Sequence, residues 1–408
     1  MTRVFAAFTA LALLGSAVHA DALIIRKGTR LDTWGMPSKI GDKPNEIEIT
    51  PDNVELYYDQ STGVIDAEGY DGITCRKTDR AKTTEFFPWS DVVRVYYAPE
   101  PESLLTGIDS MATGNWAQAI GDLRACAEDE EVRSVFRHRA RYLVGICYLQ
   151  SGRAKDAIAH FKAWPPINSR YTPEVYRILA ELYTELRQYP AARAQYDEVA
   201  KLDKITDDWK FKARLGAVKV DIAERKFAEG EQMAKRIAQE TQGRADIVNA
   251  HALALVLQAD AIFKSGNADR LPEAQSLLER GQKLEGPAPE TRAFLLVTLG
   301  HALYAQGKLE EARFPYLRAA LMYPDSGYDG TAYHNAGQCY IDMSGRLEAT
   351  DQAKSDEYLV KGMKLLGTAA GRYRNPEAGK VYREHKKRYD AIVAKEGGEA
   401  AGEGESDE

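Results

Sequence analysis

Residues 290–324 constrain the fold of this chain more than any other stretch, because they have the pattern of two amphipathic helices joined by a tight turn. In residues 291–305 the apolar side chains recur every three or four positions, which is the spacing of one helix face. Gly307 interrupts the pattern, which then resumes and ends at Pro324. The stretch therefore predicts a helical hairpin.

Gly300 lies in the interior of the first predicted helix. Glycine at such a position costs about 1 kcal/mol relative to alanine, so its presence calls for a packing reason. The second predicted helix carries Ala312 and Ala319 on the face that would meet the first. We therefore expect the two helices to approach closely, with no room at Gly300 for a larger side chain.

The same hairpin pattern recurs along the chain at intervals of 35 to 44 residues. Small residues mark the equivalent point of successive copies: Ala119, Ala157, Ala192, Gly230, Ala274 and Ala312. One copy holds about three extra residues within residues 267–271, and a last copy begins at Tyr333. The pattern predicts about seven helix pairs in residues 103–370.

The repeated residues resemble those of the tetratricopeptide repeat family, whose units are helix pairs of about 34 residues. The resemblance is carried by two strong copies: Val144-Gly145, Tyr148, Gly152, Ala157 and Phe161, then Leu299-Gly300, Leu303, Gly307, Ala312, Tyr316, Ala319 and Pro324. It implies a mainly α fold in which stacked helix pairs form a solenoid with a continuous core. Residues 371–395 supply the helix expected to cap it.

Residues 21–101 have a different pattern, with short apolar alternations separated by glycine-containing turns. Such a pattern predicts a small antiparallel β-domain, either a sheet or a barrel. Residues 27–31 and 90–95 resemble the first and last segments of SH3-like barrel domains in exported bacterial proteins. The solenoid is thus expected to follow a small all-β domain.

The first 20 residues have the features of a secretory signal peptide: Arg3, an apolar stretch over residues 4–18, and the small-x-small site Val18-His19-Ala20. An uncleaved membrane anchor is the alternative. No later segment approaches the roughly 18 apolar residues of a membrane-spanning helix. We expect a periplasmic or secreted protein without an integral span after cleavage.

The charge distribution argues against nucleic acid as a partner. The formal net charge is −7, and residues 395–408 contain six acidic residues and only one lysine, so the rest is nearly balanced. Residues 396–408 are glycine, alanine, acids and one serine, which predicts a disordered acidic tail. The sequence has no GxSxG, HExxH or GxxxxGK[ST] motif, so we expect no enzyme activity and no cofactor.

The family resemblance also implies a peptide-binding groove lined by the first helix of each unit. Carried over by position, the groove residues are Arg139, Tyr142, Ile146, Arg177, Glu181, Lys219, Asp260, His301, Tyr304, His334 and Gln338. The Lys and Asn pairs that hold a terminal carboxylate in some members of the family are missing. We expect a protein partner from the cell envelope, held by side-chain contacts in the groove. His301 and His334 lack a third ligand, so no metal site is predicted.

Two further features leave alternatives open. The β-domain is rich in aromatic residues, and Trp34 and Trp89 are candidates for stacking on a glycan such as peptidoglycan, although they also suit a small core. Cys126 and Cys147 fall on helices expected to pack together, so they are either a disulfide or two buried thiols. The expected function is an exported, non-enzymatic interaction scaffold, and the alternative is a glycan-binding module.

Overall fold

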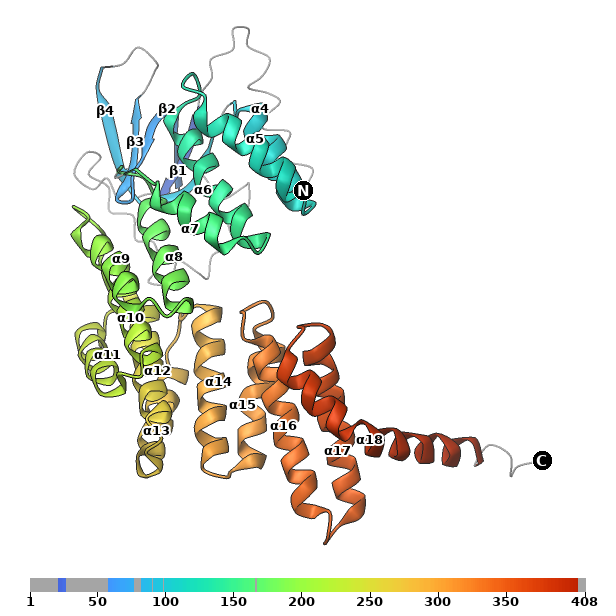
Figure 1. The fold of residues 1–408 in the computed structure, drawn as a ribbon. Coiled ribbons are helices and arrows are strands. Elements are labelled where there is room, and N and C mark those ends of the chain that lie inside the picture. The colour runs from blue at the N-terminus through green and yellow to red at the C-terminus, as the bar shows by residue number, and fades with distance from the viewer. Residues whose placement is uncertain are drawn as a thin grey trace. The chain divides into compact units, whose positions relative to one another are not determined.

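The computed structural model describes residues 21–26, 58–76, 82–89, 91–97, 99–165 and 167–402 (Figure 1). The predicted signal peptide, Trp34, residues 27–57 and the last six residues of the predicted tail lie outside this part. The chain forms two compact units, residues 1–186 with 194–206 and residues 187–193 with 207–408. The two units are described separately.

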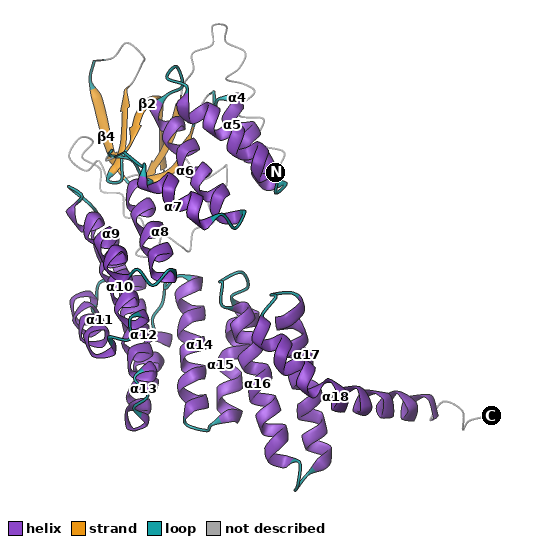
Figure 2. Ribbon diagram, viewed as in Figure 1, coloured by secondary structure: helices purple, strands orange, loops and turns teal. Residues whose placement is uncertain are grey.

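Five strands form one antiparallel sheet in the order β4-β3-β2-β1-β5 (Figure 2). They are β1 (Asp21–Arg26), β2 (Tyr58–Glu68), β3 (Gly72–Arg76), β4 (Thr84–Pro88) and β5 (Val92–Tyr96). The long strand β2 pairs with β1 through its first half and with β3 through its second half. The first and last strands are neighbours, with Leu23 opposite Val95. The predicted small antiparallel sheet is confirmed.

Seven helix pairs follow in chain order, which confirms the predicted solenoid architecture. They are α4 (Glu102–Ala112) with α5 (Trp116–Glu128), α6 (Ser134–Gln150) with α7 (Ala154–Lys162), α8 (Thr172–Glu185) with α9 (Tyr189–Lys201), α10 (Asp207–Ala223) with α11 (Phe227–Thr241), α12 (Val248–Lys264) with α13 (Leu271–Gln282), α14 (Pro289–Ala305) with α15 (Leu309–Met322), and α16 (Asp329–Leu347) with α17 (Gln352–Gly371). The extra residues expected near 267–271 form the short 3-10 helix η2 (Ala268–Arg270).

The small residues that mark the repeats lie where the helices of a pair meet. All five marker alanines are fully buried, and Gly230 is buried as well. A Cβ atom built on Gly145 would lie 2.1 Å from the ring of Phe161, and Gly300 has the same relationship to Tyr316. No larger side chain fits at either glycine without displacing an aromatic ring of the partner helix, as predicted for Gly300.

The sheet packs against the first helices and shares their compact unit. Arg133, just before α6, donates a hydrogen bond to the backbone oxygen of Ile65 at 2.7 Å. The backbone nitrogen of Arg170, just before α8, donates to the backbone oxygen of Glu68 at 3.0 Å. Ile65, Ile73 and Phe87 of the sheet are buried. The boundary expected near residue 101 therefore separates two types of secondary structure within one compact unit.

The expectation that no later segment is long and apolar enough to span a membrane is wrong. The short 3-10 helix η1 (Ala245–Ile247) and α12 together form a 20-residue stretch, Ala245–Lys264, that is long and apolar enough to cross a membrane. Yet 72% of its apolar window is buried inside the structure. This hydrophobicity belongs to a central helix of the solenoid core, where α12 packs against α10, α11, α13 and α14.

The last helix, α18 (Pro376–Gly402), is longer than the capping helix expected to end at residue 395. Its inner side packs on α17 through Val381, Tyr382, Tyr389 and Ile392, in agreement with a capping role. The helix continues into the segment expected to be disordered. Glycine is a poor helix former and supplies three of the seven residues 396–402, so helix propensity does not explain this extension.

All four cysteines are buried free thiols, so Cys126 and Cys147 form no disulfide in this structure. Both residues are fully buried in the packed helices α5 and α6. Burial raises the pKa of the Cys147 thiol to about 11, and it also raises the pKa of Cys126. Of the two alternatives, the structure has the pair of small buried side chains.

Candidate functional site

The first helices of three successive pairs, α12, α14 and α16, lie next to one another and bring several predicted groove residues together. His301 of α14 stacks on Phe263 of α12, with ring centroids 5.4 Å apart and an interplanar angle of 15°. Asn335 of α16 approaches the same imidazole, with its Nδ2 3.0 Å from Nε2 of His301. Because an amide nitrogen only donates, Nε2 is the acceptor. His301 thus links all three helices.

A second set of contacts lies about one turn further along α14 and α16. The Tyr304 hydroxyl donates a hydrogen bond to the Asp342 carboxylate, and Gln338 Nε2 donates to the same carboxylate at 2.8 Å. Burial and the Asp342 charge raise the pKa of Tyr304, which keeps its hydroxyl protonated. Tyr304, Gln338 and Asp342 are each partly exposed. They form a preorganised polar patch at the surface.

At the end of α12, Asp260 is only 4% exposed and pairs with Lys264, whose Nζ lies 2.8 Å from the carboxylate. Burial raises the pKa of Asp260, and the Lys264 charge opposes that shift. The exposed Lys264 side chain also borders a cavity of about 500 Å³. The other residues that line the cavity are Ile222, Ala223, Arg225 and Phe227. We call these residues of α12, α14 and α16 the polar row: Asp260, Lys264, His301, Tyr304, Asn335, Gln338 and Asp342.

Two predicted groove residues of this unit lie apart from those contacts. His334 is half-buried and points its Nδ1 toward Asn375, 3.4 Å from the amide oxygen, beyond the end of α17. Lys219 is exposed on α10. Asn335 and Asp342 were not predicted. Asp342 is one helical turn after Gln338, and this spacing is the sequence signal that points to it.

The predicted groove residues of the first unit have intramolecular partners. Arg177 of α8 is held between Glu174 and Glu181 of the same helix. Tyr142 of α6 stacks on Tyr171, with ring centroids 4.7 Å apart, and Ile146 is half-buried. Arg139 turns toward the sheet and pairs with Glu100 at 3.0 Å. Arg139 therefore belongs to a different site.

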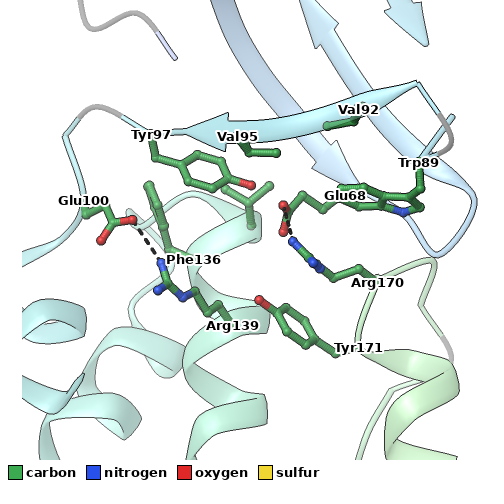
Figure 3. Close-up of a pocket in the computed structure, with 11 residues that line it drawn as sticks. Glu68, Trp89, Val92, Val95, Tyr97, Glu100, Phe136, Arg139, Arg170 and Tyr171 are labelled. Carbon is green, nitrogen blue, oxygen red and sulfur yellow. Dashed lines mark hydrogen bonds and ion pairs between the residues drawn. The ribbon is translucent and has the colours of Figure 1, made fainter. Parts of the chain in front are cut away.

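That second site is a pocket of about 630 Å³ between the sheet and the start of the helices (Figure 3). The Glu68 carboxylate is 6% exposed and accepts from Arg170 at 3.2 Å. Tyr97 and Tyr171 point into the pocket, and burial, reinforced by the Glu68 charge, raises the pKa of both hydroxyls. Two arginines face two glutamates, so the charged groups of the pocket balance one another.

Trp89 lines this pocket, but its polar and aromatic groups already have partners. Its indole Nε1 donates to the backbone oxygen of Gly69 at 2.8 Å. The Arg170 guanidinium lies over the indole ring, 4.6 Å from its centroid. Trp89 thus helps to fix the sheet against the segment before α8. Of the two tryptophans proposed for glycan stacking, it is the one within the described residues.

Arg139 and Trp89 were predicted from the sequence as binding residues. Glu68 and Arg170, which line the same pocket, were not. Glu68 and Arg170 are 102 positions apart. Their pairing depends on how the sheet packs on the helices, and no local pattern encodes it. Within the described part of the chain, no group of three or more His, Cys, Asp or Glu side chains is placed to hold a metal ion.

Comparison with known proteins agrees with the helix pairs. Residues 104–173 and 266–329 match the family described as tetratricopeptide repeat. A tetratricopeptide repeat protein from Parabacteroides merdae is 15% identical, with 69% of this chain and 96% of that chain covered and a TM-score of 0.45. A Rap protein complexed with competence and sporulation factor is 14% identical, with 72% and 97% covered and a TM-score of 0.40.

The C-terminal part of a repeat-containing protein from Cytophaga hutchinsonii is 15% identical, with 62% of this chain and 92% of that chain covered and a TM-score of 0.36. No curated protein matches the chain. The matched segments coincide with helix pairs α4–α7 and α13–α15 of the structure. These two segments are thus similar to tetratricopeptide repeats, a fold typical of protein–protein interaction scaffolds.

Proposed function

We propose that this protein is a non-enzymatic scaffold that binds a segment of a partner protein along the polar row of α12, α14 and α16. The observation that carries the proposal is the mutual ordering of that row. Phe263 and Asn335 fix His301 on two sides, and Asp342 holds both Tyr304 and Gln338. Side chains that are already ordered lose little conformational entropy when a ligand binds, which favours specific recognition.

The chemistry of the row indicates what kind of segment it binds. Lys264 offers a cation beside an open cavity, Asp342 offers an anion, and Gln338 retains its amide oxygen as an acceptor. A segment with polar side chains of both charges, and a side chain that enters the cavity at Lys264, matches this arrangement. Recognition would rest on side-chain contacts along the segment rather than on its terminal carboxylate.

We further propose that the protein is exported, on the strength of the N-terminal pattern of Arg3, residues 4–18 and Val18-His19-Ala20. Strand β1 begins at Asp21, the residue after the expected cleavage point. N-terminal sequencing of the protein from the envelope fraction tests this. A mature chain that starts at Asp21 supports export, and an intact chain retained in the cytoplasm contradicts it.

Affinity capture from a detergent extract of the envelope tests the scaffold. The mature chain is the bait, beside a row variant with Lys264→Ala and Gln338→Ala. A control variant carries Gln232→Ala and Lys283→Ala, which are exposed positions on α11 and directly after the end of α13. The proposal predicts a partner that the row variant loses and the control keeps. A partner retained equally by all three baits would contradict the assignment to the row.

The glycan alternative receives no support from Trp89, because Arg170 covers its ring and Gly69 accepts from its indole nitrogen. A sugar would have to displace the guanidinium before it could stack on that face. We therefore place the primary function in the helical repeats and give the sheet a structural role in the first unit.

A further inference from the structure

Helix α15 carries an exposed apolar stripe on the side that faces away from the solenoid core. Phe314 is 55% exposed, Leu321 65% and Met322 58%. Together with Glu311 and Arg318, Phe314 and Leu321 follow a spacing of three, four and three residues, which places the four on one helix face. This is the spacing by which one helix packs along another.

The core does not require these apolar side chains. The opposite side of α15 is already buried through Ala312, Tyr316 and Ala319, each at most 1% exposed. Leu309 and Ala320 add to that packing. The outer stripe therefore gives the folded monomer little stability while exposing large apolar groups to water, a combination that marks an interaction surface.

The other repeats serve as internal controls for this surface. The positions equivalent to Phe314, two residues after each marker, are exposed and small or polar: Gly121, Ala159, Ala194, Gln232 and Ser276. Among the positions equivalent to Leu321, those on α5, α9 and α11 and the one directly after α13 are exposed and polar: Glu128, Lys201, Gln239 and Lys283. Among these described positions, only those of α15 hold large apolar residues in both places, so the stripe distinguishes this repeat from the others compared.

Two residues of opposite charge lie beside the apolar stripe. Glu311 and Arg318 are both exposed, and they flank Phe314 at distances of three and four residues. Neither of the two forms an ion pair with another residue in the described part of the chain. A surface with one acid and one base on either side of an apolar centre is complementary to a copy of itself rotated by 180°.

We propose that α15 is a homodimer interface, at which the α15 helices of two copies of this chain pack antiparallel about a two-fold axis. In the pairing centred at the level of Tyr316, position 318 of one copy lies opposite position 314 of the other. The Arg318 stem then covers the partner's aromatic ring, and its guanidinium reaches the partner's Glu311 one turn away. The same contact occurs twice by symmetry, and Leu321 and Met322 close the two ends.

The area buried between the two α15 helices determines how stable the dimer is expected to be. A single helix pair buries less than the roughly 800 Å² per partner of a standard stable interface. The dimer is therefore expected to be in reversible equilibrium with the monomer rather than obligate. Because each monomer keeps its own continuous core, dissociation should not unfold it.

Sedimentation velocity over about a hundredfold range of protein concentration tests this. The sample is the full chain, and a second sample lacking residues 1–20 checks that the apolar N-terminal stretch does not cause the association. The expected result is a reversible monomer–dimer equilibrium in both samples. A monomer at every concentration would overturn the proposal.

Charge reversal distinguishes this interface from any other self-association. Arg318→Glu places like charges beside Glu311 of the partner and is expected to weaken the dimer at least tenfold, equivalent to about 1.4 kcal/mol. Arg280→Glu, at the equivalent exposed position of α13, is the matched control and should leave the equilibrium unchanged. A dimer insensitive to Arg318→Glu would show that α15 is not the interface.

A mixing experiment then tests the self-complementarity. Glu311→Arg and Arg318→Glu should each be monomeric alone at a concentration where the unmodified chain is dimeric, and an equimolar mixture of the two should form a heterodimer there because the ion pairs are restored across the interface. Circular dichroism confirms that both variants are folded, as expected for changes at exposed positions. Folded variants that stay monomeric in the mixture would contradict the antiparallel pairing.

Discussion

Gly300 of α14 and Tyr316 of α15 lie so close together that a Cβ atom on Gly300 would be 2.5 Å from the tyrosine ring. Tyr316 is 1% exposed and belongs to the large core cluster of the second unit, so its ring has no free space to move into. This contact sets the distance between the two helices of the pair. Gly145 and Phe161 form the equivalent contact in the first unit.

Gly300→Ala is therefore expected to destabilise the protein despite the better helix propensity of alanine. Overpacking a core costs about 1–3 kcal/mol, against a propensity gain of about 1 kcal/mol. We predict a net loss of up to about 2 kcal/mol in the free energy of unfolding, measured by urea denaturation. Gly345→Ala is the control, because a Cβ on that helical glycine meets no atom within 4 Å. It should leave stability unchanged or raise it, and a stable Gly300→Ala variant would refute the packing argument.

The four cysteines should resist alkylation in the folded protein. Burial raises the pKa of Cys147 to about 11 and that of Cys339 to about 12, and the nucleophile is the thiolate. Mass spectrometry after iodoacetamide treatment at pH 8 should show no modification of either residue. Without reductant, denaturation should expose four reactive thiols. Recovery of only two would demonstrate a disulfide, with Cys126–Cys147 as the first pair to check.

His301 should remain neutral in mildly acidic solution. Its burial between Phe263 and Tyr316, reinforced by the Lys264 charge, lowers its pKa to about 4 from an ordinary value of 6.5. The unfolded chain therefore binds a proton at higher pH than the folded chain. The resulting stability is complete above about pH 6.5 and is lost as the pH falls toward 4, by up to about 3 kcal/mol.

An NMR titration of the His301 ring measures this pKa directly. The ring resonance should stay constant between pH 8 and pH 5.5, and His301→Gln should reduce the loss of stability on acidification. A midpoint near 6.5 would mean that the imidazole is solvated. In that case the contact with Asn335 could not order the polar row as proposed.

Arg170→Ala should loosen the attachment of the sheet to the helices of the first unit. It leaves the Glu68 carboxylate, which is 6% exposed, without its cation, and it uncovers the Trp89 ring. Because Arg170 itself is 44% exposed, we expect a moderate loss of about 2–3 kcal/mol. Thermal unfolding followed by tryptophan fluorescence measures the loss.

The double variant Arg170→Ala with Glu68→Gln separates charge from packing. Removing the negative charge should recover part of the lost stability, because an unpaired neutral amide costs less to bury than a carboxylate. If the double variant is no more stable than Arg170→Ala alone, the ion pair is not what holds the sheet, and the cover over Trp89 accounts for the loss.

The helix pairs could be predicted from sequence because the same residue pattern occurs several times along the chain. The marker residues from Ala119 to Ala312 each fix a close contact between neighbouring helices, and the same spacing predicted the insertion at η2. Contacts within or between adjacent helices depend on local spacing. This is why the lack of space at Gly300 could be predicted, although the side chain that fills that space, Tyr316, was not.

The pocket of the first unit could not be predicted in the same way. Its ion pair joins Glu68 to Arg170 across 102 positions, and Arg139 turns to Glu100 rather than to a groove. The length and apolarity of Ala245–Lys264 were also missed, although both can be read from the sequence; only the burial that explains them depends on tertiary packing. The ion pairs of this pocket depend on how the sheet packs against the helices, and such long-range packing cannot be read from a single sequence.

Site-specific photocrosslinking in living cells tests whether the polar row is the surface that binds the partner. A benzophenone amino acid is placed at Lys264 or Gln338 in the polar row, and at Gln232 on α11 or Lys283 directly after α13 as controls. The account predicts that both row positions crosslink to one and the same partner segment, while the control positions do not. Equal crosslinking at row and control positions, or crosslinks from the controls alone, would contradict the assignment of the polar row as the binding surface.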